Sequence, residues 1–248
     1  MSIFYTTKFY DRDLERTSKS AAAIVPYLIS GLTSEGARAP QSVIDIGCGR
    51  GVWLRCFVDN GVPVIAGRDG PWTRQDRLLI APDRFTATDL SQPFAPAQRF
   101  DLAMTLEVAE HIDAPQADQF VDNLICLSDT IMFSAAIKGQ GGQHHVNEQP
   151  LSYWHEKFQT RGYRLYDVIR PQFWLNSDVC WWYRQNIVVF CNAQSSYQAG
   201  LEAMQHAVPP IVDLAHPTGF TEKARLANIF SPEEYLGLWF ARMKRKLL

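Results

Sequence analysis

The sequence predicts an α/β protein in which helices wrap a mostly parallel β-sheet. Short apolar stretches alternate with amphipathic ones through the middle of the chain, as strands and crossover helices do in such a sheet. The first predicted strand, over residues 42–46, runs into a turn with three glycines and then into a helix-like segment that ends near residue 58. With 248 residues, 46% of them apolar, the chain is long enough to bury the core that this fold needs.

A helix is expected over residues 11–32, ahead of the first strand, and a loose linker containing Gly, Ser and Pro follows it to residue 40. The segment 71–82 is short, so the crossover between the second and third strands is expected to contain only a stunted helix. No long helix is expected between the last two strands. Seven strands are predicted, near residues 42–46, 62–66, 84–88, 100–105, 129–134, 163–169 and 186–192.

The composition of the chain changes after residue 193. Prolines punctuate two or three helical segments there, and the last of these is expected at roughly 232–246. The predicted organisation is a helical N-terminal cap (1–40), a central domain (41–193) and a helical C-terminal extension (194–248).

Charge and cysteine content exclude several classes of protein. A net charge of −2 and an isoelectric point of about 6.3 give no basic signature for nucleic-acid binding. Five cysteines are scattered without a Cys-x-x-Cys pair, which favours reduced thiols in a cytoplasmic protein over a disulfide framework or a zinc site. The longest apolar run, 21–32, is broken by Pro26 and too short for a bilayer span, and no signal peptide is recognised. The oligomeric state is left open, with a homodimer among the alternatives.

The glycine turn after the first predicted strand carries the strongest functional signal. Gly47, Gly49 and Gly51 are spaced as Gly-x-Gly-x-Gly, and Asp45 stands just ahead of them. Glycines let the backbone turn tightly and approach a ligand closely, whereas the Asp45 carboxylate would repel a pyrophosphate and suits a ligand with an ammonium and a sulfonium group. The stretch resembles motif I of the class I S-adenosylmethionine-dependent methyltransferases. The resemblance implies a Rossmann-like seven-stranded sheet with an antiparallel last strand, and a cofactor held at these four residues.

Further residues match the positions at which this family binds its cofactor, and the resemblance spans roughly residues 40 to 192. Asp69 ends the second predicted strand, 22 residues after Gly47, where an acidic residue binds the ribose; a simple turn aspartate is the alternative. Asp89 and Leu90 follow the third predicted strand, where the family contacts the adenine. A turn or helix cap is the alternative for Asp89.

The segment after the fourth predicted strand reads Glu-Val-Ala-Glu-His from residue 107. If the chain is helical from Glu107, then Glu107, Glu110 and His111 share one face and can bind a divalent metal. Relatives with this motif, among them ubiquinone-pathway O-methyltransferases and small-RNA 2′-O-methyltransferases, hold magnesium there. Other relatives keep the motif as a hydrogen-bonded cluster beside the cofactor, without metal, and both interpretations stay open. Glu107 is also a candidate cofactor-binding residue.

The loop after the fifth predicted strand, residues 138–150, combines three glycines with a polar cluster. Its Gly-Gly and His-Val-Asn-Glu-Gln stretches resemble a signature of methyltransferases from bacterial surface-glycan and natural-product pathways. A hydroxyl acceptor must lose its proton, and an imidazole suits that task at neutral pH. We therefore expect His145 to be the general base and Glu148 to orient its ring, with His111 and then His144 as the other candidate histidines.

These observations predict a methyltransferase that uses S-adenosylmethionine and modifies an oxygen of a small polar acceptor, such as a sugar or another metabolite. Methylation of nitrogen and a non-catalytic, partner-binding subunit are the alternatives kept open. The glycine spacing argues against a nicotinamide-dependent oxidoreductase. An aromatic cluster between the last two predicted strands either packs in the core or forms a wall of the acceptor site: Phe173, Trp174, Trp181, Trp182 and Tyr183.

Overall fold

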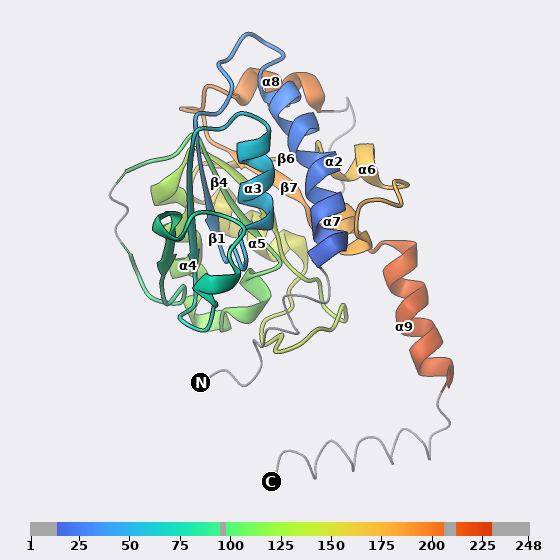
Figure 1. Cartoon of the computed structure of the whole chain (residues 1–248). Helices are drawn as coiled ribbons and strands as arrows, with labels where there is room; N and C mark the ends of the chain where they lie inside the picture. The colour runs from blue at the N-terminus through green and yellow to red at the C-terminus, as the bar shows by residue number, and fades with distance from the viewer. Residues whose placement is uncertain (1–13, 95–97, 206–211, 230–248) are drawn as a thin grey trace.

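The computed structural model describes residues 14–94, 98–205 and 212–229 (Figure 1). Its centre is a seven-stranded sheet with the strand order β3-β2-β1-β4-β5-β7-β6. The strands are β1 (Ser42–Ile46), β2 (Val64–Asp69), β3 (Phe85–Ala87), β4 (Leu102–Leu106), β5 (Thr130–Ser134), β6 (Arg164–Tyr166) and β7 (Val188–Cys191). All seven predicted strands are present, and the second begins two residues later than expected.

The pairing of the strands confirms the predicted fold class. β1 lies between β2 and β4 and is parallel to both, whereas β7 is antiparallel to β5 and to β6. The order reverses between β1 and β4, and in open sheets of this kind ligands bind outside the carboxyl ends of the strands at that point. The chain is therefore a Rossmann-like α/β fold with its antiparallel strand inserted near one edge.

Helices cover both faces of the sheet (Figure 1). One face packs against α2 and α3, with α8 beside α2, and the other packs against α4 and α5. Shorter helices, α6 and α7, join β6 to β7. The helices are α2 (Leu14–Leu32), α3 (Val52–Asp59), α4 (Ala117–Leu127), α5 (Leu151–Gln159), α6 (Arg170–Phe173), α7 (Trp181–Asn186), α8 (Gln198–Met204) and α9 (Pro217–Ile229).

Alternation along the strands places side chains in two separate cores. Val43 packs under α2 and α3, whereas the next residue, Ile44, packs on the α4 and α5 side. Met132 and Phe133 divide in the same way. Successive strand residues point to opposite faces, so a sheet covered on both sides needs apolar residues at nearly every central position.

The connections agree with the sequence prediction. Between β2 and β3 there are only two 3₁₀ turns, Gln75–Arg77 and Pro82–Arg84, in place of a crossover helix. The predicted N-terminal helix is present as α2, and the helix expected at roughly 232–246 lies outside the described residues. Figure 1 shows α9 beginning beside α7 and running away from the sheet. Within the described part of the chain, no helix is both long and apolar enough to cross a membrane.

Candidate active site

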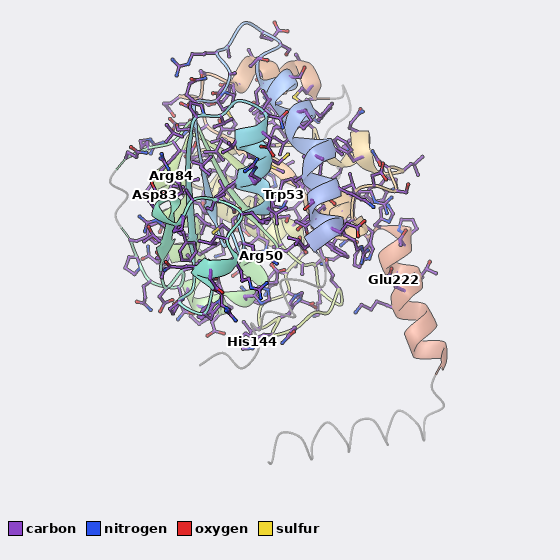
Figure 2. The ribbon with its side chains drawn as sticks, viewed as in Figure 1. Arg50, Trp53, Asp83, Arg84, His144 and Glu222 are labelled. Carbon is purple, nitrogen blue, oxygen red and sulfur yellow. The ribbon has the colours of Figure 1, made fainter. Side chains whose placement is uncertain are left out.

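A cavity of about 420 Å³ opens at the carboxyl ends of β1 and β4. The glycine turn and α3 form one side of it, and the loop after β5 forms another. α7 and the first part of α9 complete the wall. In Figure 2, Arg50, His144 and Glu222 mark the glycine turn, the loop after β5 and α9, respectively. The cavity thus lies at the reversal point of the strand order, where the fold predicts a ligand site.

The glycine turn has a backbone that other residues would strain. Gly47, Gly49 and Gly51 have φ values of 85°, 52° and 79°, in the left-handed region. A Cβ on Gly47 would lie 2.2 Å from a methyl group of Val108, so the turn is closely packed against the segment that follows β4. Gly47 N–H donates to the Arg68 carbonyl over 2.7 Å, which ties the end of β1 to β2. All three glycines and the turn they form are as the sequence predicted.

Two buried carboxylates lie behind the glycine turn. Asp69 accepts hydrogen bonds from the backbone N–H groups of Gly49 and Gly70, each over 2.6 Å. Burial nevertheless raises the pKa of Asp69 to about 6. Asp45 lines the cavity, and burial, with the nearby Asp69 carboxylate, raises its pKa well above the usual range. Asp45 therefore lines the cavity with a carboxyl group whose ionised form a cationic ligand would stabilise.

Of the other predicted cofactor residues, Glu107 lines the cavity, whereas Asp69, Asp89 and Leu90 do not. Asp69 is absent from its lining, and the ring of Trp72 packs against Gly70 beside it. Asp89 is exposed and accepts hydrogen bonds from the backbone and hydroxyl of Ser91, which are the contacts of a turn cap. Leu90 is buried on the α4 side of the sheet. The structure brings Asp45 and the glycines together and leaves Asp89 and Leu90 apart from them.

The chain is not helical from Glu107, so the condition on which the predicted metal cluster rested is not met. Glu107 has a φ of 56°, in the left-handed region, and only a 3₁₀ turn, Ala109–His111, follows. The cause is β5: the Glu107 N–H donates both to the carbonyl (3.1 Å) and to the hydroxyl (3.0 Å) of Ser134, and this holds the chain in the turn. The Glu107 carboxylate instead accepts from Asn186 Nδ2 (3.0 Å) and Gln140 Nε2 (2.8 Å).

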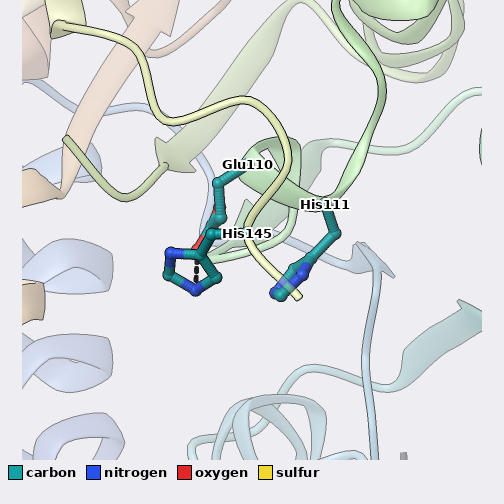
Figure 3. Close-up of side chains that lie close together, drawn as sticks. All are labelled: Glu110, His111 and His145. Carbon is teal, nitrogen blue, oxygen red and sulfur yellow. Dashed lines mark ion pairs between the residues drawn. The ribbon is translucent and has the colours of Figure 1, made fainter. Parts of the chain in front are cut away.

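The loop after β5 brings a different third ligand to the predicted metal cluster. Potential ligand atoms of Glu110, His111 and His145 lie within 4.8 Å of one another, and Glu107 is not in this group (Figure 3). Glu110 Oε1 lies 3.8 Å from His145 Nε2. The rings of His111 and His145 meet edge to face at 5.0 Å. The cluster therefore differs in one member from the predicted set of Glu107, Glu110 and His111.

Glu110 and His111 have strongly perturbed pKa values. Glu110 is completely buried, and its carboxylate oxygens accept no hydrogen bond from the residues that the structure describes. Burial, reinforced by the charge of Glu107, raises the pKa of Glu110 well above its usual range. Burial also lowers the pKa of His111 to about 4, and His111 Nδ1 lies 3.0 Å from the His144 carbonyl. His111 is thus a neutral imidazole at physiological pH.

His145 and Glu148 are in contact, as the sequence predicted. Glu148 Oε1 lies 2.7 Å from His145 Nδ1. The same carboxylate accepts from the backbone N–H groups of Gly139 (2.8 Å) and Gly141 (2.6 Å), so it closes the glycine-rich loop on itself. A Cβ on Gly142 would lie 2.1 Å from His145 Nε2. The His145 ring therefore lies between the Glu148 carboxylate and the backbone of Gly142, and it lines the cavity.

Several cavity residues have no motif in the sequence. Gln140 lines the cavity and holds the Glu107 carboxylate together with Asn186, which lies behind the wall, and Glu222 and Lys223 reach the cavity from α9. Tertiary contacts alone bring these four residues together. The aromatic cluster between the last two predicted strands is the sequence feature that pointed to this part of the wall. From that cluster Trp181, Trp182 and Tyr183 line the cavity, whereas Phe173 is core.

Comparison with protein families gives a match over residues 15–124 to a family described as a methyltransferase domain. The match covers somewhat less than half of the chain. The matched part includes α2, the glycine turn and the cluster residues Glu110 and His111, and ends within α4. Among curated protein sequences, none matched the chain.

Solved structures share the fold of this chain at low sequence identity. Magnesium protoporphyrin IX methyltransferase from Synechocystis PCC 6803, with bound S-adenosylhomocysteine, has a TM-score of 0.51 at 16% identity over 74% of this chain and 88% of its own. The sugar N-methyltransferase KedS8 from Streptoalloteichus sp ATCC 53650 has a TM-score of 0.57 at 14% identity over 77% and 94%. The plantazolicin methyltransferase BpumL, also with S-adenosylhomocysteine, has 0.53 at 16% identity over 75% and 88%.

Proposed function

We propose that the protein transfers the methyl group of S-adenosylmethionine to an oxygen of a small polar acceptor, such as a sugar or another metabolite. The observation that carries this proposal is one cavity that joins the glycine turn to the His145–Glu148 pair. A methyltransferase needs these two parts side by side, because donor and acceptor must be aligned for an in-line displacement.

The cofactor side of the cavity fits the donor. Gly47 and Gly49 leave bare backbone in the wall, and their left-handed φ values would strain any residue with a side chain. Burial raises the pKa of the Asp45 carboxyl, because no positive charge balances the buried carboxylate. The cationic ammonium group of the cofactor would supply that positive charge. Gly51 completes the turn, and Glu107 extends the wall toward the acceptor. For the ribose and the adenine we retain Asp69, Asp89 and Leu90 as the proposed contacts.

The acceptor proton has a defined place to go. Bound S-adenosylmethionine supplies an activated methyl group on a sulfonium. Glu148 accepts from His145 Nδ1–H, which leaves Nε2 as the basic nitrogen of the ring. We infer that Nε2 takes the proton of the acceptor hydroxyl and that Glu148 stabilises the resulting imidazolium. His111, with its pKa of about 4, is a much weaker base at neutral pH.

The test is the variant His145→Ala beside Glu148→Gln in the full chain. A general base contributes roughly 10²–10⁴-fold in rate, so His145→Ala should lose about that much turnover. Affinity for S-adenosylhomocysteine, measured by calorimetry, should stay unchanged in both variants. Turnover that survives within a few-fold would remove the base from His145 and favour an amine acceptor, which needs none.

A divalent cation at Glu110, His111 and His145 is a second candidate role for this site. The residues fit such an ion, because Glu110 is a buried carboxylate without a hydrogen bond among the described residues and two imidazoles lie beside it. Bound there, the ion would polarise the acceptor oxygen and lower the pKa of its hydroxyl, and His145 would be a ligand rather than a base.

Chelation separates the two roles of His145. If the ion is needed, excess EDTA should abolish methyl transfer, and added magnesium or manganese should restore it. Elemental analysis of the purified protein gives an independent measurement. Full activity in excess chelator, with no metal bound, would leave the general-base role and reduce the cluster to a structural one.

A further inference from the structure

The beginning of α9 is attached firmly to the wall of the cavity. His216, which is buried, accepts the Thr218 N–H at its Nδ1 over 3.2 Å and lies 2.8 Å from the Trp174 carbonyl at its Nε2. This caps the first turn of the helix. A Cβ on Gly219 would lie 2.5 Å from the ring of Trp181, so the helix touches α7 directly. Trp181 Nε1 donates to Glu222 over 3.1 Å.

A buried polar network joins this attachment to the reaction site. The His216 N–H donates to Gln185 Oε1 over 2.7 Å, and Gln185 Nε2 donates to Gln140 Oε1 over 3.0 Å. Gln140 Nε2 in turn holds the Glu107 carboxylate. The segment that carries α9 is therefore linked through three side chains to the cavity wall, and the placement of its first turns is part of the site.

Lys223 is the cation that this arrangement brings to the cavity. Its ammonium group lies against Gly141, where a Cβ would be 2.6 Å from Nζ, in the loop that also carries His145. Lys223 makes no ion pair or hydrogen bond with any residue that the structure describes. Glu148 is engaged by His145 and by the loop backbone, including Gly141, and Glu222 is engaged by Trp181.

Resting on the proposed function, we propose that the acceptor carries an anionic group, a carboxylate or a phosphate, and that Lys223 binds it while the reacting hydroxyl faces His145. Arg50 of the glycine turn is a second cation in the cavity wall, and it is the partner that we assign to the cofactor carboxylate. Trp181 and Trp182 also line the cavity, and aromatic side chains suit a ring in the acceptor. A charge-assisted contact of this kind fixes the orientation of the acceptor and discriminates against neutral analogues.

The experiment measures binding of matched probes to the full chain saturated with S-adenosylhomocysteine. The pairs are 4-hydroxybenzoate with 4-hydroxybenzyl alcohol, and glucose 6-phosphate with glucose, so that carboxylate and phosphate are tested separately. We expect one anionic probe to bind about 10-fold more tightly than its neutral partner. Lys223→Gln should remove this preference and Lys223→Arg should keep it.

Lys138→Gln is the matched control, because Lys138 belongs to the same loop but does not line the cavity. It should keep the preference for the anionic probe. The proposal is wrong if neither anionic probe binds more tightly than its partner, or if both glutamine variants lose the preference equally. Weaker binding of S-adenosylhomocysteine in Lys223→Gln would assign the cation to the cofactor and overturn the proposal. Absence of S-adenosylhomocysteine binding in the unaltered protein would refute the proposed function instead.

Discussion

Two glutamates of the site lie a few ångströms from the same imidazole in opposite environments. Glu148 has three partners, the N–H groups of Gly139 and Gly141 and the ring of His145. Glu110 is buried, its carboxylate accepts no hydrogen bond from the residues that the structure describes, and His145 Nε2 lies 3.8 Å away. A buried charge without hydrogen bonds costs stability, whereas a fully bonded one need not. We therefore expect Glu110 to destabilise the fold.

We predict that Glu110→Gln stabilises the protein and Glu148→Gln destabilises it. Removing a buried charge without a hydrogen bond should raise the free energy of unfolding by about 1–3 kcal/mol at neutral pH, which is roughly 2–4 °C in melting temperature per kcal/mol. Glu148→Gln should lower the melting temperature, because it replaces the carboxylate that closes the loop. Calorimetry measures both. A melting temperature that falls in Glu110→Gln would show that this carboxylate stabilises the fold.

The stabilisation of Glu110→Gln should depend on pH in a defined direction. The pKa of Glu110 is raised in the folded protein, so the native carboxyl keeps its proton at a pH where the unfolded chain has lost it. Its favourable contribution is present at low pH and is lost as the pH rises through the raised pKa. Glutamine has no proton to lose. The advantage of the variant should therefore be larger at pH 8 than at pH 5, and an equal advantage at both would contradict the buried-charge explanation.

At the scale of elements, hydrophobic pattern was enough to predict the strands but not the turn that shapes the site. β1, β4 and β5 are mostly apolar and lie within two residues of their predicted positions. β2 begins after Pro63 and continues through the charged Arg68 and Asp69, because its register is set by pairing with β1, which hydropathy does not encode. Glu107 adopts a left-handed turn because Ser134, 27 residues further on, accepts its N–H. Local sequence favours helix there, and the tertiary contact overrides it.

The loop after β5 gives a prediction for one glycine. Gly142 has no side chain, and His145 occupies the space that a Cβ would take. Gly142→Ala should therefore displace the ring from Glu148 and lower turnover roughly as far as His145→Ala does, by about 10²–10⁴-fold. S-adenosylhomocysteine affinity should be retained, because the glycine turn is untouched. Turnover close to that of the unaltered protein would show that the ring does not need its observed position.

At the scale of the whole molecule, the two sides of the cavity differ in how far sequence could predict them. The proposed cofactor side contains a contiguous motif, Asp45 with its three glycines, which the sequence alone could mark. The acceptor side is assembled from the loop after β5, α7 and α9, all beyond the residues 15–124 that match the methyltransferase family. Single residues such as Asn186 and Lys223 have no spacing that marks them. Their roles depend on packing between segments far apart in the chain.

The last prediction concerns the stabilisation of the whole protein by a ligand on the proposed cofactor side of the cavity. A ligand that binds only the folded state stabilises it by mass action, by about 2.7 kcal/mol at 100 times its dissociation constant. S-adenosylhomocysteine at that excess should therefore raise the melting temperature by roughly 5–10 °C. NADH should not, because Asp45 and the glycine spacing oppose a pyrophosphate. His145→Ala should keep the shift, since it alters only the acceptor side. A shift with NADH alone would contradict the cofactor assignment, and a shift lost in His145→Ala would show that the two sides of the cavity are not independent.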